Sequence, residues 1–282
     1  MRIMKKKTSI KELELRANMI RKSVIQMLAE AKSGHTAGSL GMADIFTALY
    51  GTFLHYNPKK PTADDRDYLI LSCGHICPVL YATLSSSGFF PEKELLTLRK
   101  LGSRLQGHPE RNCIPGIETT SGPLGQGISQ AAGIALGLRL DKKKNKVVCI
   151  TSDGEHQEGQ VWEAALFIAH QKLDIINIID RNYIQIGGNT EDSVALGSLK
   201  EKYDSFGWNT LEIDGNKMEE IVEGLTKAFQ SKGPVAIIAN TVPGKGVSFM
   251  EHDASWHGRA PNPEQAKEAL NELTKIEEGL KK

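Results

Sequence analysis

The chain has 282 residues, of which 40% are hydrophobic and 24% are charged, as in ordinary globular proteins. Its 35 basic and 34 acidic residues give a formal net charge of +1, which favours neither nucleic acid nor a membrane surface as partner. Four cysteines are too few for a secreted disulfide scaffold, and neither a signal sequence nor a membrane-spanning run is expected. These features exclude fibrous, disordered and disulfide-rich classes and favour a cytoplasmic protein.

The first half of the chain alternates helical and strand-like segments. A capping box at Ser9 and apolar residues at helical spacing predict a first helix that ends near Gly34. A glycine-rich turn at 122–127 leads into a helix at 128–140, whose small residues indicate close packing. Between the first helix and this turn we expect a helix at 42–56, a strand at 68–72, and two further helices at 76–86 and 91–101.

The second half repeats strand and helix regularly. Strands are predicted at 146–151, 174–180, 208–213 and 234–240, and helices at 159–170, 199–206, 217–231 and from Pro263 onward. Such a βαβ series predicts an α/β fold, with a parallel sheet covered by helices on both faces. We expect residues 1–282 to form one domain.

Chemically useful residues follow the predicted strands, and ligands of parallel sheets bind at the carboxyl ends of strands. Asp153 offers a carboxylate, and Gly154 lets the backbone approach a phosphate closely. Asn182 follows the next strand and offers an amide oxygen, while the turn at 122–127 offers backbone groups. Each alone is typical of an ordinary turn. Together, a carboxylate, an amide and a backbone carbonyl form half of the oxygen shell that Mg²⁺ prefers.

Ordered motifs extend this pattern along nearly the whole chain. They lie at 32–35, 39–44, 65–67, 71–75, 107–110, 119–127 and 257–261. Together with Ser152-Asp153-Gly154 and Asn182, they make the sequence resemble the thiamine-diphosphate-binding half of transketolase. That family carries Gly-Asp-Gly, followed one helix and one strand later by Asn. The resemblance implies the fold of a diphosphate-binding (PP) domain.

The resemblance also implies which residues hold thiamine diphosphate and its metal. Asp153, Asn182 and the backbone carbonyl of Ile184 would bind Mg²⁺ or Ca²⁺, and Gly154 would contact the diphosphate. The remaining cofactor contacts would come from His75, His257, Gly122, Pro123 and Leu124.

The resemblance assigns catalytic roles to His35, His75, His108, His257 and Glu158. The four histidines would line a channel above the reactive carbon, bind substrate hydroxyls and assist proton transfer, for which imidazole is suited near neutral pH. Glu158 would lie at a subunit interface, although a helix N-terminus favours a carboxylate for structural reasons as well. The other four histidines lie outside these motifs and are interpreted as ordinary residues: His55, His156, His170 and His252.

Some features depart from the family pattern. Thr36 stands where proline is usual, Ser152 replaces the first glycine of the metal motif, and Trp256 precedes His257 where longer members differ. In addition, nothing here matches the glutamate that the second domain of the family contributes. The resemblance therefore implies a separate C-terminal subunit that carries the pyrimidine-binding and C-terminal domains, in a heterotetramer of two plus two chains.

We predict reversible transfer of a two-carbon ketol unit from a ketose phosphate to an aldose phosphate, as in the pentose phosphate pathway. One alternative is a subunit of a related thiamine enzyme that acts on another sugar or an oxo acid. The motifs at 107–110 and 257–258 disfavour a deoxyxylulose-phosphate synthase, and an oxo-acid dehydrogenase subunit would lack the four histidines. A second alternative is a non-catalytic cofactor-binding or regulatory subunit, against which Asp153 and Asn182 argue.

Overall fold

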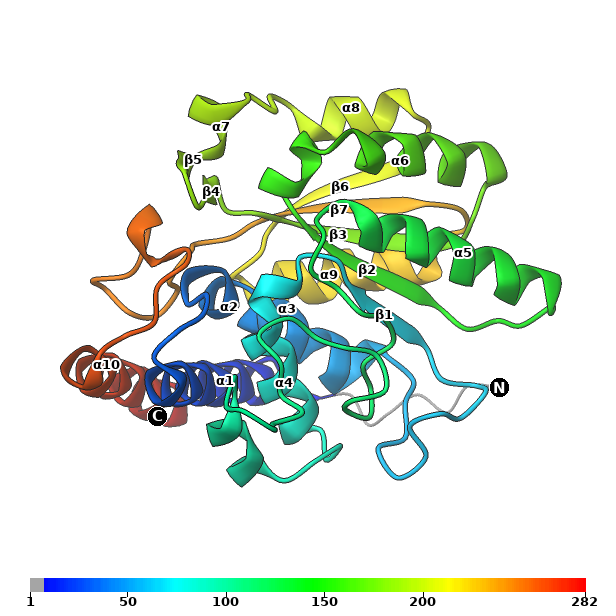
Figure 1. The fold of residues 1–282 in the computed structure, drawn as a ribbon. Coiled ribbons are helices and arrows are strands. Elements are labelled where there is room, and N and C mark those ends of the chain that lie inside the picture. Colours follow the sequence, from blue (N-terminus) through cyan, green and yellow to red (C-terminus); the bar gives the residue numbers. More distant parts are fainter. Residues whose placement is uncertain (1–7) are drawn as a thin grey trace.

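The computed structural model describes residues 8–282, and a parallel five-stranded sheet forms its centre (Figure 1). The strands lie in the order β1 (Tyr68–Leu71), β2 (Val147–Ser152), β3 (Ile175–Arg181), β7 (Val235–Asn240) and β6 (Asn209–Asp214). Every neighbouring pair is parallel. Strands β2 and β3 are buried along their whole length, as central strands covered on both faces should be. The predicted α/β class is confirmed.

Helices cover both faces of the sheet (Figure 1). One face carries α1 (Ile10–Ala31), α2 (Ala37–Gly41), α3 (Ala43–Ala48), α4 (Cys77–Ser86), α9 (Met218–Gln230) and α10 (Pro263–Lys281). The other face carries α5 (Gln126–Leu140), α6 (Gly159–Gln171) and α8 (Leu199–Ser205). Beyond the end of β3 lie the short antiparallel strands β4 (Ile184–Gln185) and β5 (Gly188–Asn189), followed by α7 (Thr190–Ser193).

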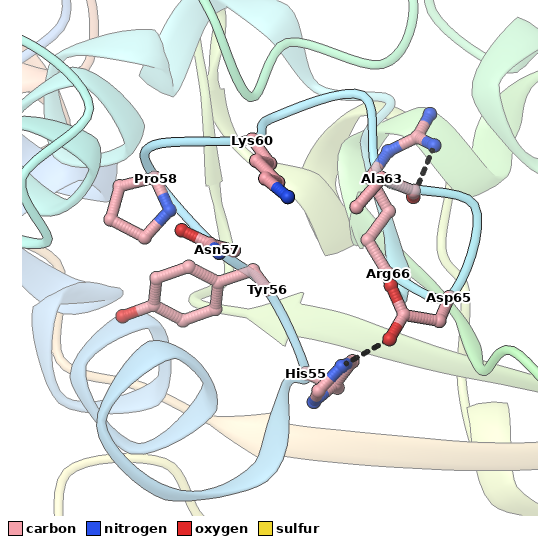
Figure 2. Close-up of a pocket in the computed structure, with 8 residues that line it drawn as sticks. All are labelled: His55, Tyr56, Asn57, Pro58, Lys60, Ala63, Asp65 and Arg66. Atoms are coloured by element: carbon pink, nitrogen blue, oxygen red, sulfur yellow. Dashed lines mark hydrogen bonds and ion pairs between the residues drawn. The ribbon is translucent and has the colours of Figure 1, made fainter.

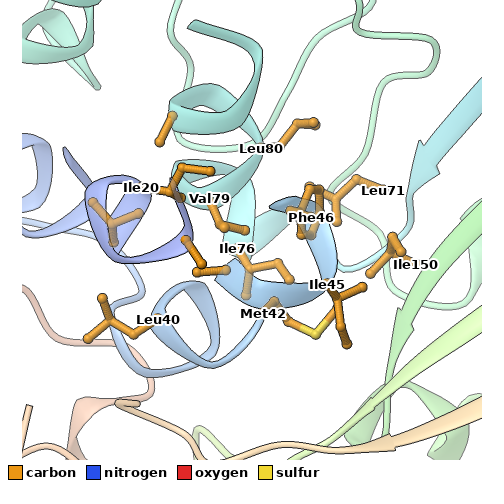
Figure 3. Packing of buried hydrophobic residues seen from close by; sticks show 14 of the residues in the cluster. Ile20, Leu40, Met42, Ile45, Phe46, Leu71, Ile76, Val79, Leu80 and Ile150 are labelled. Atoms are coloured by element: carbon orange, nitrogen blue, oxygen red, sulfur yellow. The ribbon is translucent and has the colours of Figure 1, made fainter. Parts of the chain in front are cut away.

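Two hydrophobic clusters hold these layers together, one on each face. Successive strand residues point to opposite faces. Leu71 and Ile150 therefore join the cluster under α1, α3 and α4, where Phe46 also packs (Figure 3). Ile70 and Cys149 face α5 and α6 instead. No helix in the described part of the chain is long and apolar enough to cross a membrane.

Most predicted elements are confirmed, but in the first half the helix at 42–56 is confirmed only in part and the helix at 91–101 is wrong. The segment 42–56 contains α3, a π-helical turn at Leu49–Phe53 and then extended chain, and α2 precedes it. The segment 91–101 holds only a 3₁₀ helix at Glu92–Thr97, because Leu98 turns extended and Arg99 adopts a positive φ of 60°. By contrast, the capping box at Ser9 is present as predicted.

Candidate functional site

The four predicted histidines come from four separate loops and lie together at the carboxyl ends of the strands. The ring centroid of His35 lies 5.0 Å from that of His75, 5.5 Å from that of His257 and 6.5 Å from that of His108. The rings of His75 and His257 lie 5.3 Å apart. Because these residues are far apart in sequence, only the fold creates this cluster. Their catalytic roles stay predictions.

Burial favours the neutral form of these imidazoles. Burial, together with the positive charge of His257, Arg99 and His108, lowers the pKa of His35 to about 4. Burial likewise lowers the pKa of His75 well below its usual value, and it lowers those of His108 and His257. Nδ1 of His35 is buried and has no hydrogen-bond partner among the described residues. Such an atom is a natural contact for a bound ligand.

We expect the His35 imidazole to titrate near pH 4 and to stay neutral down to about pH 5, because its burial opposes protonation. The measurement is an NMR titration of the histidine ring signals, with the His35 signal assigned by its loss in His35→Gln. A midpoint near the ordinary value of 6.5 for this ring would contradict the expectation.

The predicted metal ligand Asp153 directly follows β2, and its side chain is fully buried. Its Oδ1 accepts from the N–H of Gly154 at 2.7 Å, and its Oδ2 accepts from the N–H of Tyr183 at 2.7 Å. The Arg181 guanidinium lies 3.3 Å from the same Oδ2. Burial raises the pKa of Asp153 to about 6, although these donors favour its charged form. The two strand-end loops therefore lie side by side, as predicted.

Asn182 and Ile184 complete the predicted ligand set. Oδ1 of Asn182 accepts from the N–H of Ile184 at 3.0 Å, and its Nδ2 donates to Asp180 at 2.9 Å. Oδ1 of Asp153 and Oδ1 of Asn182 each accept one such bond, so each keeps a lone pair for a cation. A carboxylate, an amide and a carbonyl suit a hard cation such as Mg²⁺ or Ca²⁺. Residues 8–282 contain no group of three His, Cys, Asp or Glu side chains placed to bind a metal.

Glu155, which was not predicted from the sequence, is a buried carboxylate that holds the glycine-rich turn. It accepts from the Ser72 hydroxyl, from the N–H of Gly125 at 2.6 Å and from the N–H of Ser152 at 3.1 Å. The N–H of Gly127 donates to Ser72 Oγ at 3.0 Å, and a Cβ on Gly127 would lie 2.4 Å from Ser72 Cβ. Glu155 thus ties the turn to the ends of β1 and β2.

The other predicted residues lie around this turn. Pro123, Leu124 and Glu158 are exposed, and Gly122 is partly exposed. A Cβ on Gly125 would lie 3.0 Å from Glu158 Cβ, so Glu158 borders the turn. These residues are open to a ligand or a partner chain, and their roles stay predictions.

Replacing Glu155 with glutamine should loosen this turn. The new amide donor must face at least one of the three donors that now bond to the carboxylate, and such a mismatch typically costs about 1–3 kcal/mol. We expect a lower melting temperature and weaker thiamine diphosphate binding, measured by thermal unfolding and calorimetry. The control is Glu163→Gln, which makes the same change at an exposed acid of α6 outside the predicted site. Unchanged thermal unfolding and cofactor binding in Glu155→Gln would show that Glu155 does not hold the turn.

A separate hollow of about 520 Å³ (Figure 2) lies at the opposite end of the sheet, where the loop of residues 55–66 leads into the amino end of β1. Three of its titratable groups already pair: His55 lies 3.1 Å from Asp65, and Arg66 bonds to both oxygens of Glu118. Ligands of parallel sheets bind at the other edge, so this hollow is not the candidate site. It is lined by His55, Tyr56, Asn57, Pro58, Lys60, Ala63, Asp65 and Arg66.

Comparison with known proteins agrees with this geometry. The profile of the family described as "Transketolase, thiamine diphosphate binding domain" matches residues 13–275. The chain is 38% identical to an apulose-4-phosphate transketolase subunit of Phocaeicola vulgatus, over 97% of this chain and 98% of that protein. It is 39% identical to a 6-deoxy-6-sulfo-D-fructose transketolase subunit of a Clostridium species, over 94% of this chain and 97% of that protein.

Solved structures give the same relationship. Transketolase from Campylobacter jejuni superposes with a TM-score of 0.89 at 33% sequence identity. The match covers 95% of this chain but 43% of the Campylobacter chain. The fold described above is therefore that of one part of a longer transketolase.

Proposed function

The chain belongs to the transketolase family, and on that premise we propose that it is the diphosphate-binding subunit of a two-chain transketolase. The enzyme transfers a two-carbon ketol unit reversibly from a ketose phosphate to an aldose phosphate. One observation carries the proposal: four imidazoles, of which three are partly buried and that of His108 is exposed, gather at the end of the sheet that holds the Asp153 and Asn182 loops.

In this proposal the strand-end loops hold the cofactor. Asp153, Asn182 and the carbonyl of Ile184 bind Mg²⁺ or Ca²⁺ against the diphosphate, which Gly154 contacts. A Cβ on Gly154 would lie 3.0 Å from Gln185 Oε1, so this position has little room for a side chain. When bound, thiamine diphosphate supplies the nucleophilic carbon that accepts the two-carbon unit.

In this proposal the histidines bind the sugar hydroxyls and take up a proton from them. A neutral imidazole can donate through one ring nitrogen and accept through the other, so it can bind a hydroxyl and take up its proton. Nδ1 of His35 suits this role because it is buried without a partner in the described part of the chain. The low pKa of His35 keeps the ring neutral at pH 7, and therefore able to accept a proton.

A separate chain would supply the rest of the active site, in a heterotetramer of two plus two chains. The names of two relatives describe them as transketolase subunits, and this chain spans nearly all of each. Those names also mention apulose 4-phosphate and 6-deoxy-6-sulfofructose, so related sugars belong among the substrates to test. All four cysteines are free thiols, which suits the reducing cytoplasm.

The test is a ketol-transfer assay on this chain alone, and then with the candidate partner subunit, thiamine diphosphate and Mg²⁺. Donors are xylulose 5-phosphate, apulose 4-phosphate and 6-deoxy-6-sulfofructose, and ribose 5-phosphate is the acceptor. We expect transfer only in the mixture. Decarboxylation of pyruvate instead would favour an oxo-acid enzyme, and cofactor binding without any turnover would favour a non-catalytic subunit.

A further inference from the structure

A buried chain of hydrogen bonds runs from the sheet to the loop that carries Asp153. Thr151 Oγ1 lies 3.1 Å from Asn177 Oδ1, and Asn177 Nδ2 lies 3.1 Å from the Tyr203 hydroxyl. That hydroxyl lies 3.0 Å from His156 Nε2, and His156 Nδ1 lies 2.7 Å from the Ser152 carbonyl. All these side chains are buried. The chain thus links β2, β3 and α8 to the loop after β2.

The donors and acceptors of this chain follow from its chemistry. The Ser152 carbonyl can only accept, so His156 Nδ1 must carry the hydrogen. Burial lowers the pKa of His156 to about 4, so the ring is neutral at pH 7 and its Nε2 accepts. The Tyr203 hydroxyl therefore donates to Nε2 and accepts from Asn177. Every polar atom at these contacts has a matching partner.

The hydrogen bond between His156 Nδ1 and the Ser152 carbonyl spans the predicted cofactor residues Asp153 and Gly154. Ser152 and His156 stand on either side of Asp153 and Gly154, and the His156 N–H also donates to the Asp153 carbonyl at 2.8 Å. The imidazole therefore closes a ring across the loop. Tyr203 fixes that imidazole from α8.

We propose that His156 and Tyr203 are positioning residues that hold the loop 152–156 in the shape required for metal and diphosphate binding. The proposal rests on the proposed function for the identity of the ligand. It assigns a role to His156, which the sequence alone suggested was an ordinary residue. Neither side chain contacts the ligand; both act through the backbone of the loop.

Three variants test the individual hydrogen bonds of this chain. Tyr203→Phe removes one hydroxyl and leaves His156 Nε2 and Asn177 Nδ2 without that partner. His156→Leu removes the donor to the Ser152 carbonyl, whereas the amide of His156→Asn can restore it. The matched control is Trp208→Phe, which removes a buried hydrogen bond to the Ala165 carbonyl beside Tyr203 but leaves the loop contacts intact.

Two measurements apply to each variant. The first is hydrogen exchange of the amides at 152–157 in the cofactor-free chain. The second is calorimetric binding of thiamine diphosphate with saturating Mg²⁺ to the chain together with its partner. We expect Tyr203→Phe and His156→Leu to exchange faster at this loop and to bind roughly tenfold more weakly, the usual size of such outer-shell effects. His156→Asn should recover most of the affinity, and Trp208→Phe should bind like the wild type.

The outcomes are distinguishable. Loop protection and affinity that fall equally in all four variants, or in none, would overturn the positioning role, because a purely structural defect would not depend on the donor to Ser152. Absence of thiamine diphosphate binding by the wild-type complex would count against the proposed function. Hydrogen exchange would still decide whether the hydrogen-bond chain holds the loop.

Discussion

Replacing Asp153 with asparagine should nearly abolish ketol transfer by the assembled enzyme. Both carboxylate oxygens now accept from donors, Gly154 on one side and Tyr183 with Arg181 on the other. An amide has only one oxygen, so its NH₂ group must face a donor in either orientation. The substitution also removes the only carboxylate of the proposed ligand set. Loss of metal assistance costs several kcal/mol in a barrier, so we expect at least a roughly hundredfold lower kcat/KM.

The measurements are steady-state ketol transfer and calorimetric titration of thiamine diphosphate with Mg²⁺. The variant should remain folded because Arg181 keeps Glu191 as a counter-ion at 2.9 Å. Asp192→Asn is the control, since it makes the same change at an exposed acid of α7. Full activity and normal cofactor affinity in Asp153→Asn would remove this residue from the metal site.

The second half of the fold could be predicted closely because each strand and helix there is bounded by turn residues. Every element from β2 to α10, apart from the short β4, β5 and α7 and the 3₁₀ turns, lies within one residue of its predicted bounds. The segment 36–50 could not be predicted in this way. All of its residues are buried, so no polar face marks where α2 ends and α3 begins.

The site was predictable to the extent that its residues sit at strand ends. Asp153 and Asn182 follow neighbouring parallel strands, and topology alone brings such loops together. Glu155 and Arg181 were missed because their partners, Ser72 and Gly125 for one and Glu191 for the other, are set by tertiary packing. In the sequence, only their positions indicate these two residues: Glu155 stands two residues after Asp153, and Arg181 stands directly before Asn182.

Replacing His35 with alanine should lower kcat/KM for ketol transfer by about 10²- to 10⁴-fold, the range for loss of a general acid–base group. His35 is the most central imidazole, with the other three ring centroids within 6.5 Å. Its buried Nδ1, without a partner among residues 8–282, is free to meet a substrate hydroxyl. Because Asp153 and Asn182 stay intact, affinity for thiamine diphosphate should change by less than about threefold, well below the effect of losing a ligand.

His55→Ala is the matched control, because His55 lies at the opposite edge of the sheet beside Asp65 (Figure 2). It should leave both kcat/KM and cofactor affinity unchanged. His35→Gln retains a polar side chain and should recover part of the loss if the ring mainly binds a hydroxyl, but little if it moves a proton. A fall in cofactor affinity as large as the fall in kcat/KM would instead make His35 part of the cofactor site, since a residue that meets only the sugar leaves cofactor binding untouched.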